Sequence, residues 1–155
     1  MATVIRGDDN FDSADNGRVI GVTTLVNTTR QALPIVAEHW ISYGTVVKKS
    51  ATSKLICTEC TSGQQNYSGT SGVGVKLGTT IIYGNSNYTG QPHSHQYQQT
   101  FDFGTMGGAG SFGVSWGWKC MSGGAKPFVV LNPNVSDDNR YSQTRSTIVI
   151  LEVEA

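Results

Sequence analysis

The residues best able to do chemistry in this sequence are two thiols and two imidazoles at short spacing. Cys57 and Cys60 form a Cys-x-x-Cys pair, and His93 and His95 form a His-x-His pair. Such side chains bind zinc and other transition metals, and a Cys-x-x-Cys pair also carries out thiol–disulfide exchange. Both chemistries require the two side chains of a pair to converge on one point.

The Cys-x-x-Cys pair lies in a strand-like run, residues 54–61. Residues three apart in a strand point to opposite faces, so we expect the thiols of Cys57 and Cys60 to diverge. The remaining cysteine, Cys120, completes no second pair. Because free cysteine is among the most buried residue types, the sequence favours small buried thiols over a metal or redox centre.

The His-x-His pair falls in a segment rich in glycine, proline, serine and tyrosine. Two histidines on one edge of an extended segment can hold a transition metal, but histidine alone does not specify such a site. A polar, aromatic-bearing surface loop explains the same residues. We therefore expect a loop around His93 and His95, with no metal and no other cofactor.

Two further patterns match motifs without the context that their chemistry needs. Ser115 lies in a Gly-x-Ser-x-Gly pentapeptide, the nucleophile elbow of α/β-hydrolases, but it sits within a strand pattern and all three histidines precede it. Residues 8–12 resemble the start of a calcium loop, yet Ser13 and Val19 stand where that loop needs glycine and glutamate. We expect neither an enzyme nor an EF-hand calcium site.

Composition places these residues in an all-β chain of one domain. Of 155 residues, 19 are glycine, 14% are charged and 37% are hydrophobic. Helical bundles use more Ala, Glu, Lys, Leu and Arg, and disordered chains carry more charge with fewer apolar groups. A chain of this length forms a single domain with a sizeable core.

The charge balance argues against nucleic acid and membrane as partners. Lys and Arg total 11, as do Asp and Glu, so the formal net charge is 0, and no basic block occurs. No apolar run reaches the roughly 18–20 residues that span a bilayer. The start, MATVIRGDDN, lacks the basic and apolar stretches of a secretory signal. We expect synthesis in a reducing cytoplasm.

Alternating and β-branched segments predict eight or nine short strands. The clearest is 111–120, where Phe112, Val114, Trp116 and Trp118 share one face. The predicted strands lie at 18–26, within 34–47, at 54–61, as two strands turning near Gly78 within 72–83, and at 99–103, 111–120, 128–131 and 145–153. We therefore predict one antiparallel β-sandwich over 18–155, with jelly-roll-like connectivity and a last strand buried on both faces.

The first seventeen residues differ from the rest, and we expect them to form an extended acidic arm. They hold four of the chain's eleven acids and end at Asn16-Gly17, a turn pair. An acidic arm of this kind can order on contact with a partner. The candidate docking residues are Asp8, Asp9, Phe11, Asp12 and Asp15.

The second face of 111–120 carries almost no side-chain volume. A second sheet packed about 10 Å away would call for larger residues to fill that space. We therefore predict a subunit interface at Ser115 and Gly117, since closed symmetric oligomers are common for identical chains.

Three segments carry a resemblance to a known family: GRVIGV from Gly17, KSATSKLIC from Lys49, and the terminal YSQTRSTIVILEVEA. Together they make the chain similar to a small virion-protein family of bacteriophages, especially tailed phages of marine bacteria. Its members include knob-like or decoration proteins on the capsids of cyanobacterial podophages and carboxy-terminal domains of tail fibres. The similarity spans most of 18–155, and only its terminal strand is fairly specific.

The resemblance implies a β-sandwich on the outside of a virion, with no catalytic residues. It implies a non-enzymatic structural protein that decorates the capsid by docking on the major capsid protein, alone or as a homo-oligomer. The family domain begins directly after the arm, without the stalk of long fibre proteins, which favours a free-standing capsid protein.

The alternative is a tail-fibre tip or receptor-binding module that recognises a host saccharide or surface protein. Trp40, the loop from Tyr83 to Tyr97 with Tyr88, and His93 would then be exposed contacts. Capsid decoration requires many copies in each virion and a tail appendage only a few, so copy number separates the two.

Overall fold

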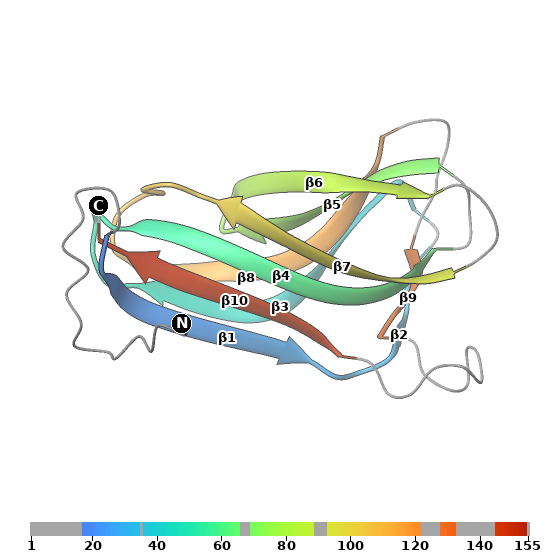
Figure 1. The fold of residues 1–155 in the computed structure, drawn as a ribbon, viewed down its shortest axis with the longest axis horizontal. Coiled ribbons are helices and arrows are strands. Elements are labelled where there is room, and N and C mark those ends of the chain that lie inside the picture. The colour runs from blue at the N-terminus through green and yellow to red at the C-terminus, as the bar shows by residue number, and fades with distance from the viewer. Residues whose placement is uncertain are drawn as a thin grey trace, which may run out of the picture.

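Every regular element in the described part of the chain is a strand. The computed structural model describes residues 17–34, 36–65, 69–88, 93–121, 128–132 and 145–154. Within them lie ten strands and no helix (Figure 1). The strands are β1 (Val19–Asn27), β2 (Gln31–Ala32), β3 (Glu38–Lys48), β4 (Lys54–Gln65), β5 (Gly69–Leu77), β6 (Thr80–Tyr88), β7 (His93–Asp102), β8 (Gly110–Cys120), β9 (Phe128–Leu131) and β10 (Ser146–Val153).

The candidate docking residues Asp8, Asp9, Phe11, Asp12 and Asp15 lie outside the described residues. Their docking role therefore stays a prediction.

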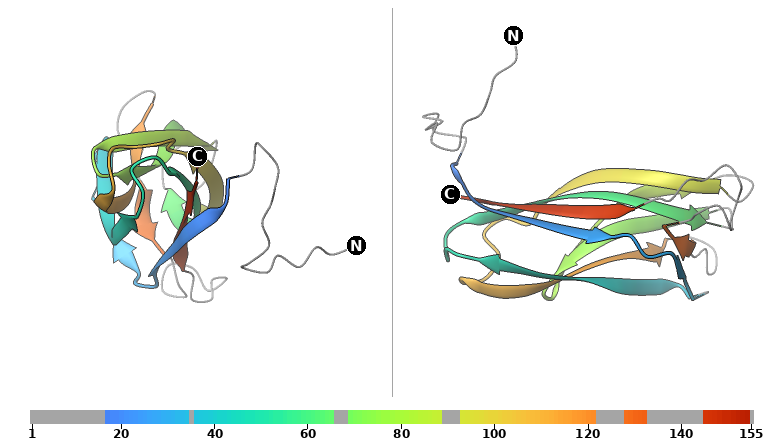
Figure 2. Two further views of the ribbon diagram at one scale, coloured as in Figure 1. Left: turned by 90° about the vertical axis from the view of Figure 1, so that its left-hand side faces the viewer. Right: turned by 90° about the horizontal axis from the view of Figure 1, so that it is seen from below.

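The eight long strands form two antiparallel sheets in jelly-roll order. The first sheet contains β1-β10-β4-β7, and the second contains β3-β8-β5-β6. In chain order, the first, eighth, third and sixth long strands thus share one sheet, and the second, seventh, fourth and fifth share the other. This is the double Greek-key arrangement of a jelly roll. Figure 2 shows the sheets as two facing layers, and the predicted β-sandwich is confirmed.

Two short strands extend the first sheet at one end. β10 pairs with β4 as far as Cys60, and β9 pairs with β4 from Gly63 onward. β2 lies beside β9 and pairs with it, just as β1 pairs with β10. Asn132, directly after β9, holds this end together, because its Nδ2 donates to Asn27 O at 2.9 Å and its Oδ1 accepts from Ser146 Oγ at 2.6 Å.

The Trp-rich strand β8 supplies the centre of the core, as its alternation predicts. Val114, Trp116 and Trp118 are fully buried, and Phe112 and Cys120 pack against the same cluster. Other fully buried apolar side chains come from both sheets, namely Leu55, Cys57, Val73, Val75, Leu77, Leu131 and Ile148.

The last strand, β10, is buried on one face and half-buried on the other, so the prediction of burial on both faces is wrong in part. Ile148 and Ile150 point into the sandwich, while Val149 and Leu151 point outward and stay partly exposed. Among the described residues, no further layer covers the outside of the first sheet. Glu152 is 2% exposed and points inward with the isoleucines, so its carboxylate needs partners inside the fold.

Two glycines sit where the backbone requires them. Gly78, at φ +59°, turns the chain between β5 and β6, which confirms the predicted turn. Gly44, at φ +135°, lies in a bulge of β3 where the register against β8 shifts by one residue. Residues with side chains rarely adopt either conformation.

Candidate functional site

The Cys-x-x-Cys thiols diverge as the sequence predicts. Cys57 points into the core and is fully buried, and burial raises the pKa of its thiol to about 12. Cys60 lies on the opposite face of β4, opposite Thr147 and Gln98 of the neighbouring strands. Within the described residues, no group of three or more His, Cys, Asp or Glu side chains is placed to hold a metal ion.

The histidine pair lies in a strand, so the expected loop is wrong at these positions. His93 and His95 begin β7 and pair with Gln65 and Gly63 of β4. The segment around His93 and His95 forms a strand because the long strand β4 offers it an edge to pair with. The segment's own residues show little apolar alternation. Tyr88 ends β6, and the contacts of these three side chains lie outside what the structure describes.

Ser115 lies in the middle of β8 and not at a strand-to-helix turn. It is partly exposed on the outer face of the second sheet, between Ser42 of β3 and Lys76 of β5. No histidine or acid shares that register row.

Within the described residues there is also no helix that could cross a membrane.

The outer face of the first sheet presents nine uncharged side chains on three neighbouring strands. Val22 and Val26 of β1 are 63% and 53% exposed, and the central strands contribute partly exposed side chains beside them. We call this surface the valine–threonine face; it consists of Val22, Thr24, Val26, Thr147, Val149, Leu151, Ile56, Thr58 and Cys60.

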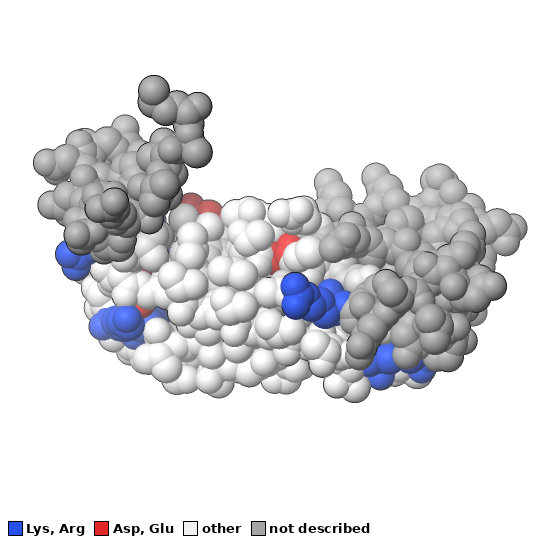
Figure 3. Space-filling model, turned by 60° about the horizontal axis from the view of Figure 1, so that its bottom comes forward, with Lys and Arg blue, Asp and Glu red and all other residues white. Residues whose placement is uncertain are grey.

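Charged groups border the valine–threonine face. Lys54 lies beyond it on β4, and Asp102 lies opposite Ile56 on β7. In Figure 3, which brings the β1 side of the molecule forward, the surface is mostly white, with a few separate basic and acidic side chains. Exposed apolar side chains grouped on one face, such as Val22 and Val26, are candidates for an interaction site.

The outer face of the second sheet carries two aromatic rings over two glycines. Trp40, Gly117, Gly74 and Tyr83 occupy one register row across β3, β8, β5 and β6. A Cβ placed on Gly117 would come within 2.6 Å of the Trp40 ring, and one on Gly74 within 3.0 Å of the Tyr83 ring. The rings therefore lie down over the glycine backbones, with their centroids 5.7 Å apart.

This arrangement bears on the interface predicted at Ser115 and Gly117. Gly117 is buried, and the Trp40 ring of the same chain covers it. Its lack of a side chain thus has an intramolecular cause. Ser115 remains partly exposed in the next row, and the subunit interface stays a prediction that now depends on Ser115.

Glu38 joins the two rings at their polar ends. Its Oε1 accepts hydrogen bonds from Trp40 Nε1 at 3.0 Å and from Tyr83 Oη at 3.2 Å. Lys119 Nζ lies 3.7 Å from its other oxygen, Oε2. The hydrogen bond from Trp40, with help from Lys119 and Tyr83, holds the pKa of Glu38 below its usual value, while burial and Glu38 raise the pKa of Tyr83 to about 12.

A second carboxylate, Glu152, organises the turn between β3 and β4. Its Oε1 accepts hydrogen bonds from the amides of Lys49 and Ser50 and from the hydroxyl of Ser53. Burial acts to raise the pKa of Glu152, but these hydrogen bonds and nearby Lys48 hold it below its usual value. Lys48 is 1% exposed and donates to Ser50 O at 2.7 Å.

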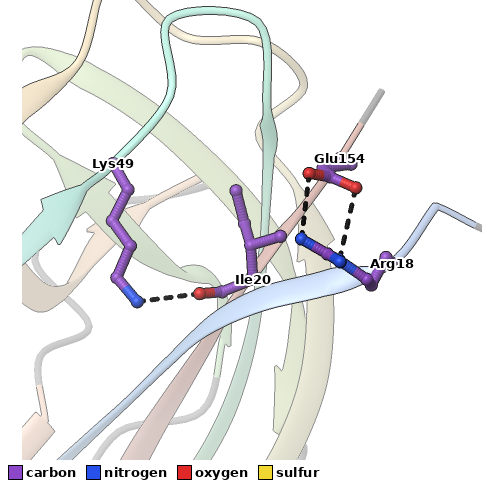
Figure 4. Close-up of polar contacts among 4 residues, drawn as sticks. All are labelled: Arg18, Ile20, Lys49 and Glu154. Carbon is purple, nitrogen blue, oxygen red and sulfur yellow. Dashed lines mark hydrogen bonds and ion pairs between the residues drawn. The ribbon is translucent and has the colours of Figure 1, made fainter. Parts of the chain in front are cut away.

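The same end of the molecule carries two exposed contacts at the start of β1 and just before it. Lys49 Nζ donates to Ile20 O at 2.8 Å, and Arg18 pairs with Glu154 at 3.4 Å (Figure 4). The turn, β1 and the residue after β10 are therefore fastened together.

A third carboxylate, Glu59, lies fully inside the sandwich. Thr61 Oγ1 donates to its Oε2 at 2.5 Å, and Gln99 Nε2 lies 3.5 Å from its Oε1. Burial raises its pKa to about 7, although Thr61 and Trp116 act in the opposite direction. Glu59 is therefore closed off from solvent.

Sequence reasoning singled out Trp40 and named Tyr83 as the start of a contact loop, which the structure instead places in β6. It missed the partners Glu38 and Lys119 and the pairing of the two rings. The available signal was the presence of glycines at alternate positions of two strands, which marks a close approach. That signal does not say which side chain approaches the glycines, because the sequence of one strand does not reveal its register against the neighbouring strand.

The comparisons with known proteins identify no family. No family model matches the chain, and no curated protein matches it. Among solved structures, a chain in the structure of infectious bursal disease virus, Gx strain, is 13% identical with a TM-score of 0.41; the match covers 87% of this chain and 37% of that one. A chain in the crystal structure of the T13 IBDV viral particle is 15% identical with a TM-score of 0.40, covering 99% and 40%.

This chain thus spans less than half the length of either structural match. A likeness this distant supports no conclusion about function.

Proposed function

We propose that this chain is a non-enzymatic structural protein of a bacteriophage virion, which decorates the outside of the capsid by docking on the major capsid protein. The observation that carries the proposal is the valine–threonine face, an uncharged surface on the outside of the first sheet. The resemblance of the terminal strand and of the 49–57 segment to a phage virion family supports it.

An uncharged face of mostly β-branched residues suits repeated packing against a protein shell. Covering it buries apolar area, worth about 25 cal/mol for each Å² removed from water. It leaves no unpaired charge in the contact, and such a charge would cost several kcal/mol. The threonine hydroxyls can hydrogen-bond with either a partner or trapped water.

The acidic arm supplies a second contact in this proposal. Gly17, the last residue of the arm, lies against Glu154 and Val153 at the end of β10. In this proposal, the arm and the valine–threonine face bind the same partner.

The test is incorporation of a charged variant into virions. Val22→Lys with Val26→Lys places two ammonium groups on the face, and we expect the number of copies per particle to fall at least about tenfold, since each unpaired buried charge costs several kcal/mol. Val47→Lys is the matched control, because Val47 on the second sheet is also 63% exposed.

Quantitative mass spectrometry of purified particles gives the copy number. Normal incorporation of the double variant would contradict docking through this face. A wild-type count of only a few copies per particle would contradict decoration itself and favour the tail appendage.

A further inference from the structure

The aromatic row on the second sheet lies on the opposite side of the sandwich from the valine–threonine face. Trp40 and Tyr83 come from the two flanking strands, β3 and β6, and the two inner strands supply glycine at the same level. The core lies behind this sheet and is filled by Trp116 and Trp118. The two outer rings therefore contribute little to the core.

The rings form a fixed platform that is open to solvent. Each ring rests on a strand backbone with one side, because the glycine beneath it has no side chain. Both residues stay partly exposed, and the planes of the rings meet at 47°. Met121, 50% exposed, lies beside Gly72 and Tyr83 and extends the apolar surface.

The polar ends of the rings are held by one carboxylate. Trp40 Nε1 and Tyr83 Oη both donate to Glu38 Oε1, while Lys119 faces Glu38 Oε2. These contacts restrict rotation of both rings before any ligand arrives. Such preorganisation lowers the entropic cost of binding.

A purely structural role explains part of this arrangement. Aromatic side chains cover glycines in sheets and protect their backbone hydrogen bonds. That role requires a ring over each glycine. It does not require one carboxylate to fasten both rings, nor a lysine at its second oxygen.

We propose that Trp40 and Tyr83, with Glu38 and Lys119 at their polar ends, bind a neutral pyranose-containing glycan. A pyranose has one face of C–H groups, whose positive edges are attracted to the negative face of an aromatic ring. Its hydroxyls donate to the carboxylate and accept from the ammonium group. Apolar surface with a few placed polar groups is the usual make-up of a ligand site.

The charges favour a neutral sugar over an acidic one. The group that touches both rings is a carboxylate, and Lys119 offsets its charge. Lys76 lies one row further, beside Ser115. An acidic sugar stacked on the rings would place its own carboxylate next to Glu38, which is unfavourable.

The experiment screens the purified full chain on a glycan array carrying neutral and sialylated oligosaccharides. The best neutral glycan is then titrated into ¹⁵N-labelled protein. We expect the Trp40 indole N–H signal to shift while those of the buried Trp116 and Trp118 stay in place. We expect no retention of the sialylated probes.

The variants separate binding from folding. Glu38→Gln and Lys119→Gln alter exposed groups and should leave the fold intact, while weakening binding by at least about tenfold, the cost of a lost charged hydrogen bond. Trp40→Ala should abolish binding. Ile81→Ala, one row away on the same face and 37% exposed, is the control that should bind normally.

Several results would overturn the proposal. These are the absence of binding to every neutral glycan, exclusive binding of sialylated probes, or unchanged binding by a folded Trp40→Ala variant. The Val22→Lys/Val26→Lys variant should still bind glycan, so failure of capsid docking and failure of glycan binding are distinguishable.

Discussion

Ser53 donates a hydrogen bond of 2.5 Å to Glu152 Oε1, across 99 residues of sequence. The bond joins the turn before β4 to the inward face of β10. The amides of Lys49 and Ser50 donate to the same oxygen at 2.8 and 2.9 Å. One buried carboxylate thus holds the β3–β4 turn against the last strand.

Replacing that carboxylate should destabilise the whole sandwich. Glu152→Ala leaves three donors without their acceptor, and we expect a loss of about 3 kcal/mol in the free energy of unfolding. Urea denaturation measures it. Glu154→Ala, which removes only an exposed ion pair with Arg18, should cost less than about 0.5 kcal/mol; equal losses would contradict a special role for Glu152.

Glu152 also predicts acid sensitivity. Its pKa is below the usual value in the folded state, so its carboxylate adds stability above the unfolded pKa and that stability is lost as pH falls through the folded pKa. The difference in unfolding free energy between wild type and Glu152→Gln should therefore shrink as the pH is lowered from 6 to 3. A difference that is independent of pH would argue against this linkage.

For Glu59 we predict the opposite dependence of folding stability on pH. Burial raises its pKa to about 7, above its value in the unfolded chain, so the folded state holds a proton that the unfolded state releases. Stability should fall as pH rises from 4.5 to 7, by at most roughly 3 kcal/mol. In Glu59→Gln this fall should be absent, as shown by urea denaturation of both proteins at pH 5 and pH 8.

Substitutions at Gly117 and Ser115 test the predicted subunit interface separately from folding. Gly117→Leu forces a side chain against the Trp40 ring and His39 O, and should cost at least about 1–3 kcal/mol by overpacking. Ser115→Leu has more room and should leave the unfolding midpoint nearly unchanged. Light scattering of the Ser115 variant then reports on assembly, and an unchanged oligomeric state would remove Ser115 from any interface.

Removing residues 1–16 tests the arm. We expect an unchanged thermal midpoint by circular dichroism, because Arg18 O still accepts from Glu154 N, together with loss of capsid incorporation. Full incorporation of the shortened chain would contradict docking through the arm and leave the valine–threonine face as the remaining contact.

The strands were predictable where each carries its own pattern. The alternation at 111–120 and the β-branched runs at 18–26 and 145–153 place β8, β1 and β10 within a residue or so at each end. β7 was predicted only from Gln99, because the residues from His93 onward are polar. They become a strand because β4 continues beside them.

The candidate sites were less predictable for a related reason. Each one combines residues from several strands, and the register that brings them together is a property of pairing. Trp40 and Tyr83 face each other across two strands only because Gly117 and Gly74 fall at the same level. Glu152 stands out as an acid within the apolar run 148–153, but its partners Ser53 and Ser50 lie in a turn whose path no local pattern reveals.

The position of β10 between β1 and β4 has a consequence for biosynthesis. During translation, residues 19–27 and 54–65 leave the ribosome long before residues 146–153, their shared partner. The first sheet can close only when that late segment arrives, and pairing across such separations is slow. Until then, the edges of β1, which is rich in valine, and of β4 stay open to other chains. Rapid overexpression should therefore yield more aggregated chain than slow synthesis at low temperature.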